Sequence, residues 1–167
     1  TTETFNYSPE GLLQNSTAVT TKAGKTISTS VSNYTVGKDG RDQITSRTTT
    51  LGTGEVTTET FNYSPEGILK DSVAVTTKGG QTISTSTSTY SMGLDGSDQL
   101  TQRTTVLGTG ESTTENFEYN VNGTLKTSVA STTKAGVIGS TAVSNYAMAA
   151  DGRDQLKDRT TTLPTGE

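Results

Sequence analysis

The sequence predicts an all-β protein, an elongated antiparallel tandem-repeat β structure in the form of a hairpin superhelix or a solenoid-like array. Three observations carry this prediction: Thr and Ser dominate the 167 residues, 18 glycines are present and many recur at regular intervals, and long segments repeat. Thr is β-branched and favours strands, whereas Gly and Ser favour turns. We expect about four strands in each repeat and no helix.

The repeat has a period of about 56 residues, with no insertion or deletion. The segment TTETFNYSPEG of residues 1–11 returns unchanged at residues 57–67, and TTENFEYNVNG at residues 113–123 is its third copy. Because TGE also recurs near the end of every repeat, we expect the chain to be an excerpt from a longer array. The three repeats are residues 1–56 (repeat 1), 57–112 (repeat 2) and 113–167 (repeat 3).

Recurring glycines mark the expected turns, because Gly accepts the positive φ that tight turns require. Between them, repeat 1 has four stretches with the composition of strands: TTETFNY, LLQNSTAVTT, KTISTSVSNYTV and QITSRTTTL. In the first stretch, alternation places Glu3, Phe5 and Tyr7 on one face of a strand. The turn glycines are Gly11, Gly67, Gly123, Gly24, Gly80, Gly136, Gly40, Gly96, Gly152, Gly54, Gly110 and Gly166.

Six apolar positions recur in every repeat and are expected to form its core. A repeat with so few apolar side chains buries too little surface to fold well alone, so neighbouring repeats are expected to stack. The alternative is three separate small barrels on a string. The predicted core residues are Phe5, Tyr7, Leu13, Tyr34, Ile44, Leu51, Phe61, Tyr63, Leu69, Tyr90, Leu100, Leu107, Phe117, Tyr119, Leu125, Tyr146, Leu156 and Leu163.

The segments that follow the first strand of each repeat resemble the YD (RHS) repeat, in which Tyr-Asp is followed after two residues by Gly-Arg-Leu and later by a second Gly. A looser match, Tyr34…Asp39-Gly40-Arg41…Ile44, makes each repeat similar to two such hairpins. The resemblance implies β-hairpin strips that spiral into shells or fibres in large secreted and cell-surface proteins. The matching segments are Tyr7-Ser-Pro-Glu-Gly11-Leu-Leu13, Tyr63-Ser-Pro-Glu-Gly67-Ile-Leu69 and Tyr119-Asn-Val-Asn-Gly123-Thr-Leu125, with Gly24, Gly80 and Gly136 as the second Gly.

The composition excludes several classes of site. The chain has no Cys and no His, which removes disulfides, Cys or His metal ligands, Cys nucleophiles and His general bases. A net charge of −4 excludes a polybasic surface for nucleic acid, and no run of 18 apolar residues would insert into a membrane. The same carboxylates recur in every repeat, whereas an active site is normally unique, so we do not expect an enzyme.

The recurring Asp-Gly-x-Asp-Gln motif has two interpretations. As a loop site, its carboxylates would bind calcium, which prefers oxygen ligands. As a hairpin turn, Asp-Gly would form the turn and a second Asp would cap backbone donors. Two carboxylates per loop are few for calcium, so we favour the turn and expect no cofactor. The carboxylates concerned are Asp39, Asp42, Asp95, Asp98, Asp151 and Asp154.

The strand surfaces suggest three functions. Thr-x-Thr runs such as residues 85–89 place hydroxyls on one face at ~6.6–7 Å spacing, as in an ice-binding array. Recurring Tyr side chains suggest a multivalent adhesin or carbohydrate-binding module that binds surface glycans through avidity. We favour a third function, a structural repeat segment of an extracellular or cell-surface fibre, stalk or filament. Its expected partners are further copies of itself or further repeats of the same chain.

Overall fold

The computed structural model describes residues 1–38 and 40–164, which form twelve β-strands and contain no helix, and thus no helix that could cross a membrane. The predicted all-β class with four antiparallel strands in each repeat is confirmed. Equivalent strands begin and end at nearly equivalent positions in the three repeats. The strands are β1 (Thr2–Tyr7), β2 (Leu13–Lys22), β3 (Lys25–Val36), β4 (Asp42–Leu51), β5 (Glu55–Tyr63), β6 (Leu69–Lys78), β7 (Gln81–Met92), β8 (Asp98–Leu107), β9 (Glu111–Tyr119), β10 (Leu125–Lys134), β11 (Val137–Met148) and β12 (Asp154–Thr162).

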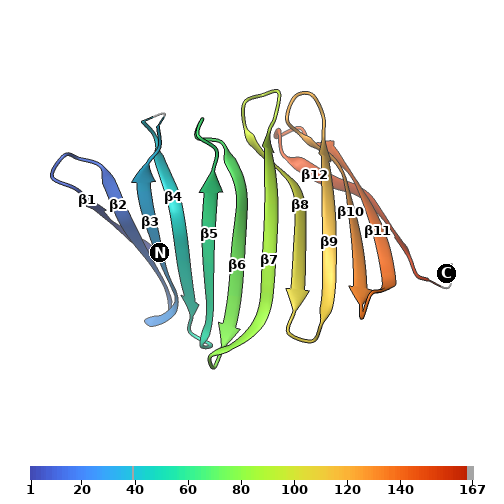
Figure 1. Cartoon of the computed structure of the whole chain (residues 1–167), viewed down its shortest axis with the longest axis horizontal. Helices are drawn as coiled ribbons and strands as arrows, with labels where there is room; N and C mark the ends of the chain where they lie inside the picture. The colour runs from blue at the N-terminus through green and yellow to red at the C-terminus, as the bar shows by residue number, and fades with distance from the viewer. Residues whose placement is uncertain (39, 165–167) are drawn as a thin grey trace. The chain divides into compact units, whose positions relative to one another are not determined.

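The chain divides into two compact units, unit 1 (Thr1–Thr85) and unit 2 (Ser86–Glu167), and the division falls within β7. In unit 1 each strand from β1 to β6 pairs with the next strand along the chain (Figure 1). In unit 2 the strands from β8 to β12 do the same. The pairs β4–β5 and β8–β9 join neighbouring repeats in one ladder, so the alternative of three separate barrels is wrong.

The hairpin loops at one end of the strands share one hydrogen-bond pattern. In the loop of residues 8–12, the Ser8 amide donates to the Leu12 carbonyl over 2.8 Å, and the Gly11 amide donates to the Ser8 carbonyl over 2.9 Å. Gly11 has a φ of 82°, as expected for a type I turn that ends in a left-handed glycine. Each repeat therefore consists of two hairpins with the same kind of loop. The equivalent loops begin at Gly37, Ser64, Gly93, Asn120 and Ala149.

Two-residue turns join β2 to β3, β6 to β7 and β10 to β11. Ala23 and Gly24 have φ values of 49° and 73°, which is the pattern of a type I′ turn. Ala135 has a φ of 51°, whereas Gly79 stands at the equivalent position of repeat 2 with a φ of 58°. A left-handed alanine costs roughly 1–2 kcal/mol, so the repeat 2 turn is the least strained of the three.

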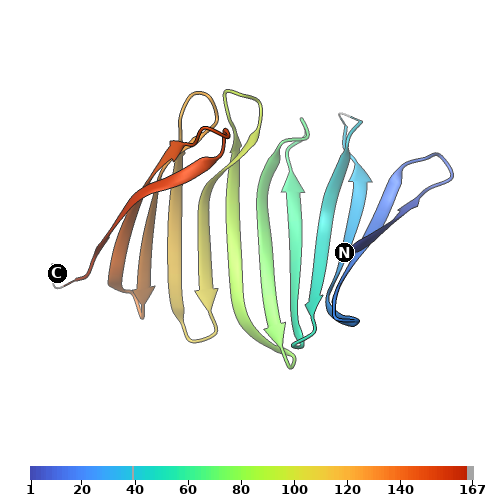
Figure 2. The ribbon, with the colours of Figure 1, turned by 180° about the vertical axis from the view of Figure 1, so that it is seen from behind.

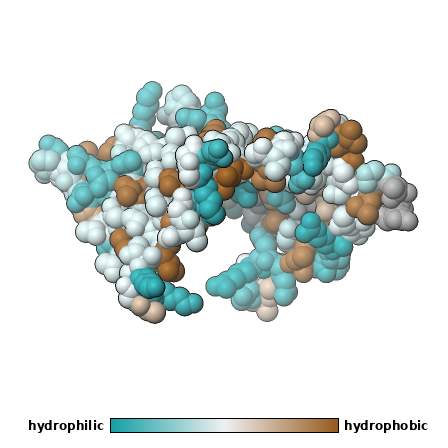
Figure 3. All heavy atoms as spheres, turned by 90° about the horizontal axis from the view of Figure 1, so that it is seen from below, coloured by the Kyte–Doolittle hydropathy of each residue, from teal (hydrophilic) through white to brown (hydrophobic). Residues whose placement is uncertain are grey.

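Burial is shallow throughout the described residues. Among these residues, Ala142 is the one buried apolar side chain, and it is 6% exposed. Within unit 1, strands β1 to β6 form one layer (Figures 1 and 2), and these strands supply no second layer over either face. In Figure 3, apolar residues lie singly or in small groups among polar ones. In a single layer, a side chain is shielded only by neighbours on the same face.

The predicted core requires correction, because none of its residues is fully buried. Twelve are partly buried and six are exposed, and within unit 1 the single layer of β1 to β6 offers no second layer to cover them. The exposed residues lie on β1 or β12, which have one neighbouring strand, or at strand ends beside turns. Those exposed are Phe5, Tyr7, Leu51, Leu107, Leu156 and Leu163; those partly buried are Leu13, Tyr34, Ile44, Phe61, Tyr63, Leu69, Tyr90, Leu100, Phe117, Tyr119, Leu125 and Tyr146.

Candidate functional site

Six serines are the most deeply buried polar residues of the described chain. Their exposed fractions range from 1% for Ser72 to 7% for Ser144. Each repeat contributes two of them, near the middle of its second and third strands. Their burial does not follow from composition, although serine occupies both positions in all three repeats. The set comprises Ser16, Ser32, Ser72, Ser88, Ser128 and Ser144.

Register explains why these serines are buried in a single-layered sheet. Ser16 on β2 lies opposite Phe5 on β1 and opposite Ser32 on β3, so all three side chains share one face. The Tyr34 hydroxyl lies 3.4 Å from Ser16 Oγ. The small serine thus leaves room above the strand for larger side chains. In each unit, we call the surface formed by its buried serines and the aromatic residues beside them the serine–aromatic face.

The same arrangement recurs in unit 2. Ser128 lies opposite Phe117 and Ser144, and its Oγ lies 3.4 Å from the Tyr146 hydroxyl. The Tyr119 hydroxyl donates to the Leu100 carbonyl over 3.0 Å, and partial burial raises the pKa of this tyrosine above its ordinary value. Tyrosine therefore packs against the sheet and bonds to it.

A further polar contact ties the serine–aromatic face to a charged residue. Ser72 Oγ donates to Glu59 Oε1 over 3.1 Å, and Glu59 lies opposite Arg47 on the neighbouring strand. In unit 2, Glu115 lies opposite Arg103 in the same register. An opposite-charge pair thus recurs on the two strand pairs that join one repeat to the next.

Hydroxyl pairs connect neighbouring strands on both faces. Thr57 and Thr76 hydroxyls lie 2.9 Å apart, on the face that also carries Glu59. On the other face, the Thr48 and Thr58 hydroxyls lie 3.4 Å apart. That face mixes valine with threonine, since Val31 lies opposite Thr48. The threonines therefore bond to one another across strands, and their rows are interrupted by apolar residues.

The structure shows how the Asp-Gly turns use their carboxylates. Asp95 Oδ1 accepts bonds from the Ser97 amide over 3.2 Å and from the Ser97 hydroxyl over 2.8 Å. This bonding holds the pKa of Asp95 below its ordinary value. Asp151 Oδ1 accepts a bond from the Arg153 amide over 3.1 Å. In repeats 2 and 3, the first Asp of the motif therefore caps its own turn.

The second Asp of the motif has a different partner in repeat 3. Asp154 Oδ1 accepts a bond from the Leu125 amide of the neighbouring hairpin over 3.1 Å. Of the other carboxylates considered for calcium, Asp39 lies outside the described residues, and Asp42 and Asp98 are exposed. Among the residues that are described, no three carboxylates gather in a group that would hold a metal ion.

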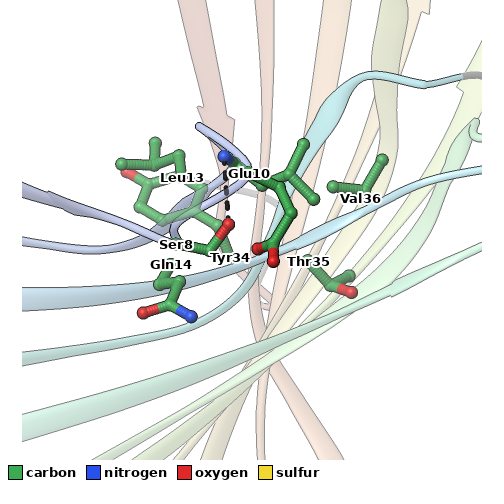
Figure 4. A pocket seen from close by; sticks show the side chains of 8 residues that line it. Ser8, Glu10, Leu13, Gln14, Tyr34, Thr35 and Val36 are labelled. Atoms are coloured by element: carbon green, nitrogen blue, oxygen red, sulfur yellow. Dashed lines mark hydrogen bonds between the residues drawn. The ribbon is translucent and has the colours of Figure 1, made fainter.

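An open hollow lies beside the first hairpin loop (Figure 4). It has a volume of about 350 Å³, and its lining combines Glu10 and Gln14 with Leu12, Tyr34 and Val36. The Leu12 amide donates to Ser8 Oγ over 3.3 Å, which fixes the loop. A hydrogen bond with the Ser8 side chain lowers the pKa of Glu10, so this carboxylate is ionised at neutral pH. The hollow thus presents a carboxylate, an amide and an aromatic ring to solvent.

Comparisons with known proteins leave the family of the chain open. No family model matches it, and no curated protein matches it. A solved structure that resembles it is that of a protein of unknown function from Bacteroides fragilis NCTC 9343. The two sequences are 16% identical over 92% of this chain and 95% of that chain, with a TM-score of 0.22. A similarity of this size supports no conclusion about function.

Proposed function

We propose that the chain is a structural repeat segment of an extracellular fibre, stalk or surface filament. The observation that carries the proposal is the pairing of β4 with β5, in which repeat 1 continues into repeat 2 through an unbroken ladder. The pair β8–β9 repeats this junction between repeats 2 and 3. A protein built in this way gains length by adding repeats, each of which stabilises its neighbour.

The surface chemistry supports the proposal. Hydroxyl pairs such as Thr104 with Thr114, 3.1 Å apart, satisfy polar side chains without a thick apolar core. The chain has 28% hydrophobic residues, so a sheet of this kind keeps a polar surface on both faces. A secreted or cell-surface location accords with this role and with the resemblance to YD repeats.

Electron microscopy of the natural material tests this proposal. We expect thin fibres of uniform width whose length increases with the number of repeats. A matched pair of chains with three and six repeats provides the control, because width must stay constant while length grows. A globular particle whose width increases with repeat number would contradict the proposal.

A second candidate function is that of a multivalent carbohydrate-binding module. The hollow beside Glu10 favours it, because a ring such as Tyr34 beside polar groups is suited to stacking on a sugar. Binding to a glycan array, lost in a Tyr34→Ala variant and retained in Thr60→Ala, would support this function. Equal signals from both variants and from a non-binding control protein would exclude it.

A further inference from the structure

The outer edges of β1 and β12 match a pairing that the chain already uses twice. Among the strands described, β1 pairs with β2 alone and β12 with β11 alone, and every residue of both strands is exposed. By position in the repeat, β1 is equivalent to β5 and β9, and β12 is equivalent to β4 and β8. The pairs β4–β5 and β8–β9 therefore show how an edge of the β12 type fits an edge of the β1 type.

We infer that β12 of one copy of the chain adds to β1 of a second copy as an antiparallel strand. The register is that of β4–β5, which places Arg159 opposite Glu3 and Thr160 opposite Thr2. This inference rests on the proposed function, because it supplies the joint through which a fibre would grow from separate chains. The contact is heterologous, so each copy uses β1 toward one neighbouring copy and β12 toward another.

Charge complementarity favours this register. Arg47 lies opposite Glu59 in β4–β5, and Arg103 lies opposite Glu115 in β8–β9. Arg159 and Glu3 occupy the same positions on the two outer edges and are exposed. Opposite charges that face each other across strands are favourable, whereas like charges there are unfavourable. Pairing of β1 with a second β1 would lose this match.

Hydroxyl contacts favour the same register on the other face. The Thr48 and Thr58 hydroxyls lie 3.4 Å apart, and the Thr104 and Thr114 hydroxyls lie 3.1 Å apart. The equivalent contact between copies joins Thr160 to Thr2. One face of the joint thus repeats hydroxyl contacts that exist inside the chain, and the other face repeats the same order of opposite charges.

The end of β12 differs from the end of β4 on its inner side. The Gly52 amide donates inward, to the Ile27 carbonyl of β3, over 2.9 Å. Pro164 stands at the equivalent place and lacks this donor, which accounts for the end of β12 at Thr162. The proline therefore removes one inward donor and leaves the outward backbone groups of residues 158–161 unchanged.

Disulfide trapping tests the joint directly, because the chain contains no Cys. A Thr2→Cys chain and a Thr160→Cys chain, which carry tags of different size, are mixed under mild oxidation. We expect the mixed dimer to exceed both homodimers by at least about tenfold, a preference of about 1.4 kcal/mol. The preference must disappear in denaturant. Homodimers as abundant as the mixed dimer, or no cross-link above the denatured control, would overturn the inference.

An off-register variant provides the matched control. Asp158→Cys lies two residues from Thr160 on the same face, so its side chain is ~7–8 Å from the partner Thr2→Cys, which is beyond the reach of a disulfide. We expect little cross-linking from this pair. Equal yields from Asp158→Cys and Thr160→Cys would show an unspecific encounter and refute the proposed register.

A charge exchange tests the joint without cysteines. In sedimentation experiments, Glu3→Arg is expected to lower the association constant at least about tenfold. Mixing the Glu3→Arg chain with a chain that carries Arg159→Glu is expected to restore the association constant, because the two charges at the joint are then exchanged. Glu66→Arg makes the same charge change in the exposed loop after β5 and should leave association intact. Failure of Arg159→Glu to restore association would contradict the pairing.

Two outcomes distinguish a failure of the joint between copies from a failure of the proposed fibre. Fibres in natural material without the mixed cross-link would mean that fibres grow within one polypeptide, which refutes the joint alone. The mixed cross-link in small closed particles would confirm the joint and refute the fibre.

Discussion

Strands β1 and β5 contain the same sequence in different surroundings. Residues 1–7 and 57–63 both read TTETFNY, but β5 lies between β4 and β6, whereas β1 pairs with β2 alone among the described strands. Phe5 and Tyr7 are 46% and 58% exposed, while Phe61 and Tyr63 are partly buried. Because the residues are identical, the added neighbour accounts for the difference. In this fold, a side chain is therefore buried by the strands that flank its own strand within the sheet.

The difference extends to charged residues. Glu59 on β5 is partly buried and accepts a hydrogen bond from Ser72, whereas the equivalent Glu3 on β1 is exposed. The edge keeps some contacts on this face, since the Thr1 and Thr20 hydroxyls lie 2.8 Å apart, but Glu3 lacks the partial burial that two flanking strands give Glu59. Stability should accordingly depend on the number of flanked strands, and the following predictions test that dependence.

The largest effect is expected when one repeat is isolated. In a chain of residues 57–111, both outer strands would have the one-sided environment of β1. We expect this chain to be largely unfolded, while the three-repeat chain is folded, as measured by circular dichroism. A two-repeat chain should be intermediate. The same stability per repeat in chains of one, two and three repeats would contradict the account.

A matched pair of aromatic substitutions sharpens the comparison. Phe61→Ala is expected to lower the free energy of unfolding by about 2 kcal/mol, below the ~3–5 kcal/mol of a fully buried Phe. Phe5→Ala removes the same ring from β1 and should cost less than about 1 kcal/mol. Urea unfolding measures both losses. Equal losses would mean that the neighbouring strand does not set the burial of the ring.

The buried serines provide a smaller test. Ser72→Ala removes the bond to Glu59 and is expected to cost about 1 kcal/mol, the usual net value of a hydrogen bond. Ser16→Ala removes only the longer contact to Tyr34 and should cost less. A loss from Ser16→Ala greater than that from Ser72→Ala would show that the contact to tyrosine matters more than the bond to Glu59.

The smallest effect concerns the Asp95 turn, which is fully exposed. Ser97→Ala removes the hydroxyl whose hydrogen bonding is the largest cause of the lowered pKa of Asp95, so this pKa should rise toward its ordinary value. Because the folded pKa is lowered, the contribution of this turn is present above the unfolded pKa and is lost as pH falls through the folded value. Carbon-detected NMR titration measures the pKa of Asp95. The control variant is Ser8→Ala, which alters the pKa of Glu10 and should leave that of Asp95 unchanged.

Most of the fold follows from residues that recur. The expected strand KTISTSVSNYTV coincides with β3, and QITSRTTTL differs from β4 by one residue at its start. These boundaries were predictable because turn glycines such as Gly24 and Gly40 have positive φ in the structure. The irregular register between Asn33 and Tyr34 was not predicted, since a β-bulge has no signature in this composition.

The candidate site was less predictable than the strands. Apolar residues such as Leu51 were expected in a core, although the sequence pattern does not reveal that only one layer of sheet exists in unit 1. Ser16 and Ser72 are buried because large side chains lie beside them, an effect that depends on register between strands. The recurrence of serine at the same positions in all three repeats was the sequence signal that could have identified these residues. Composition alone predicts serine on the surface.

Hydrogen exchange on β1 and β5 tests the central claim most directly. The Glu3→Arg variant is used so that association between copies does not protect β1. In β5, successive amides of residues 58–60 point alternately to β4 and β6, so all of them should exchange slowly. In β1, residues 2–4 should alternate between slow and fast exchange, because amides that point away from β2 have no strand to bond. Uniform slow exchange in both strands would contradict the claim that lateral neighbours alone provide protection.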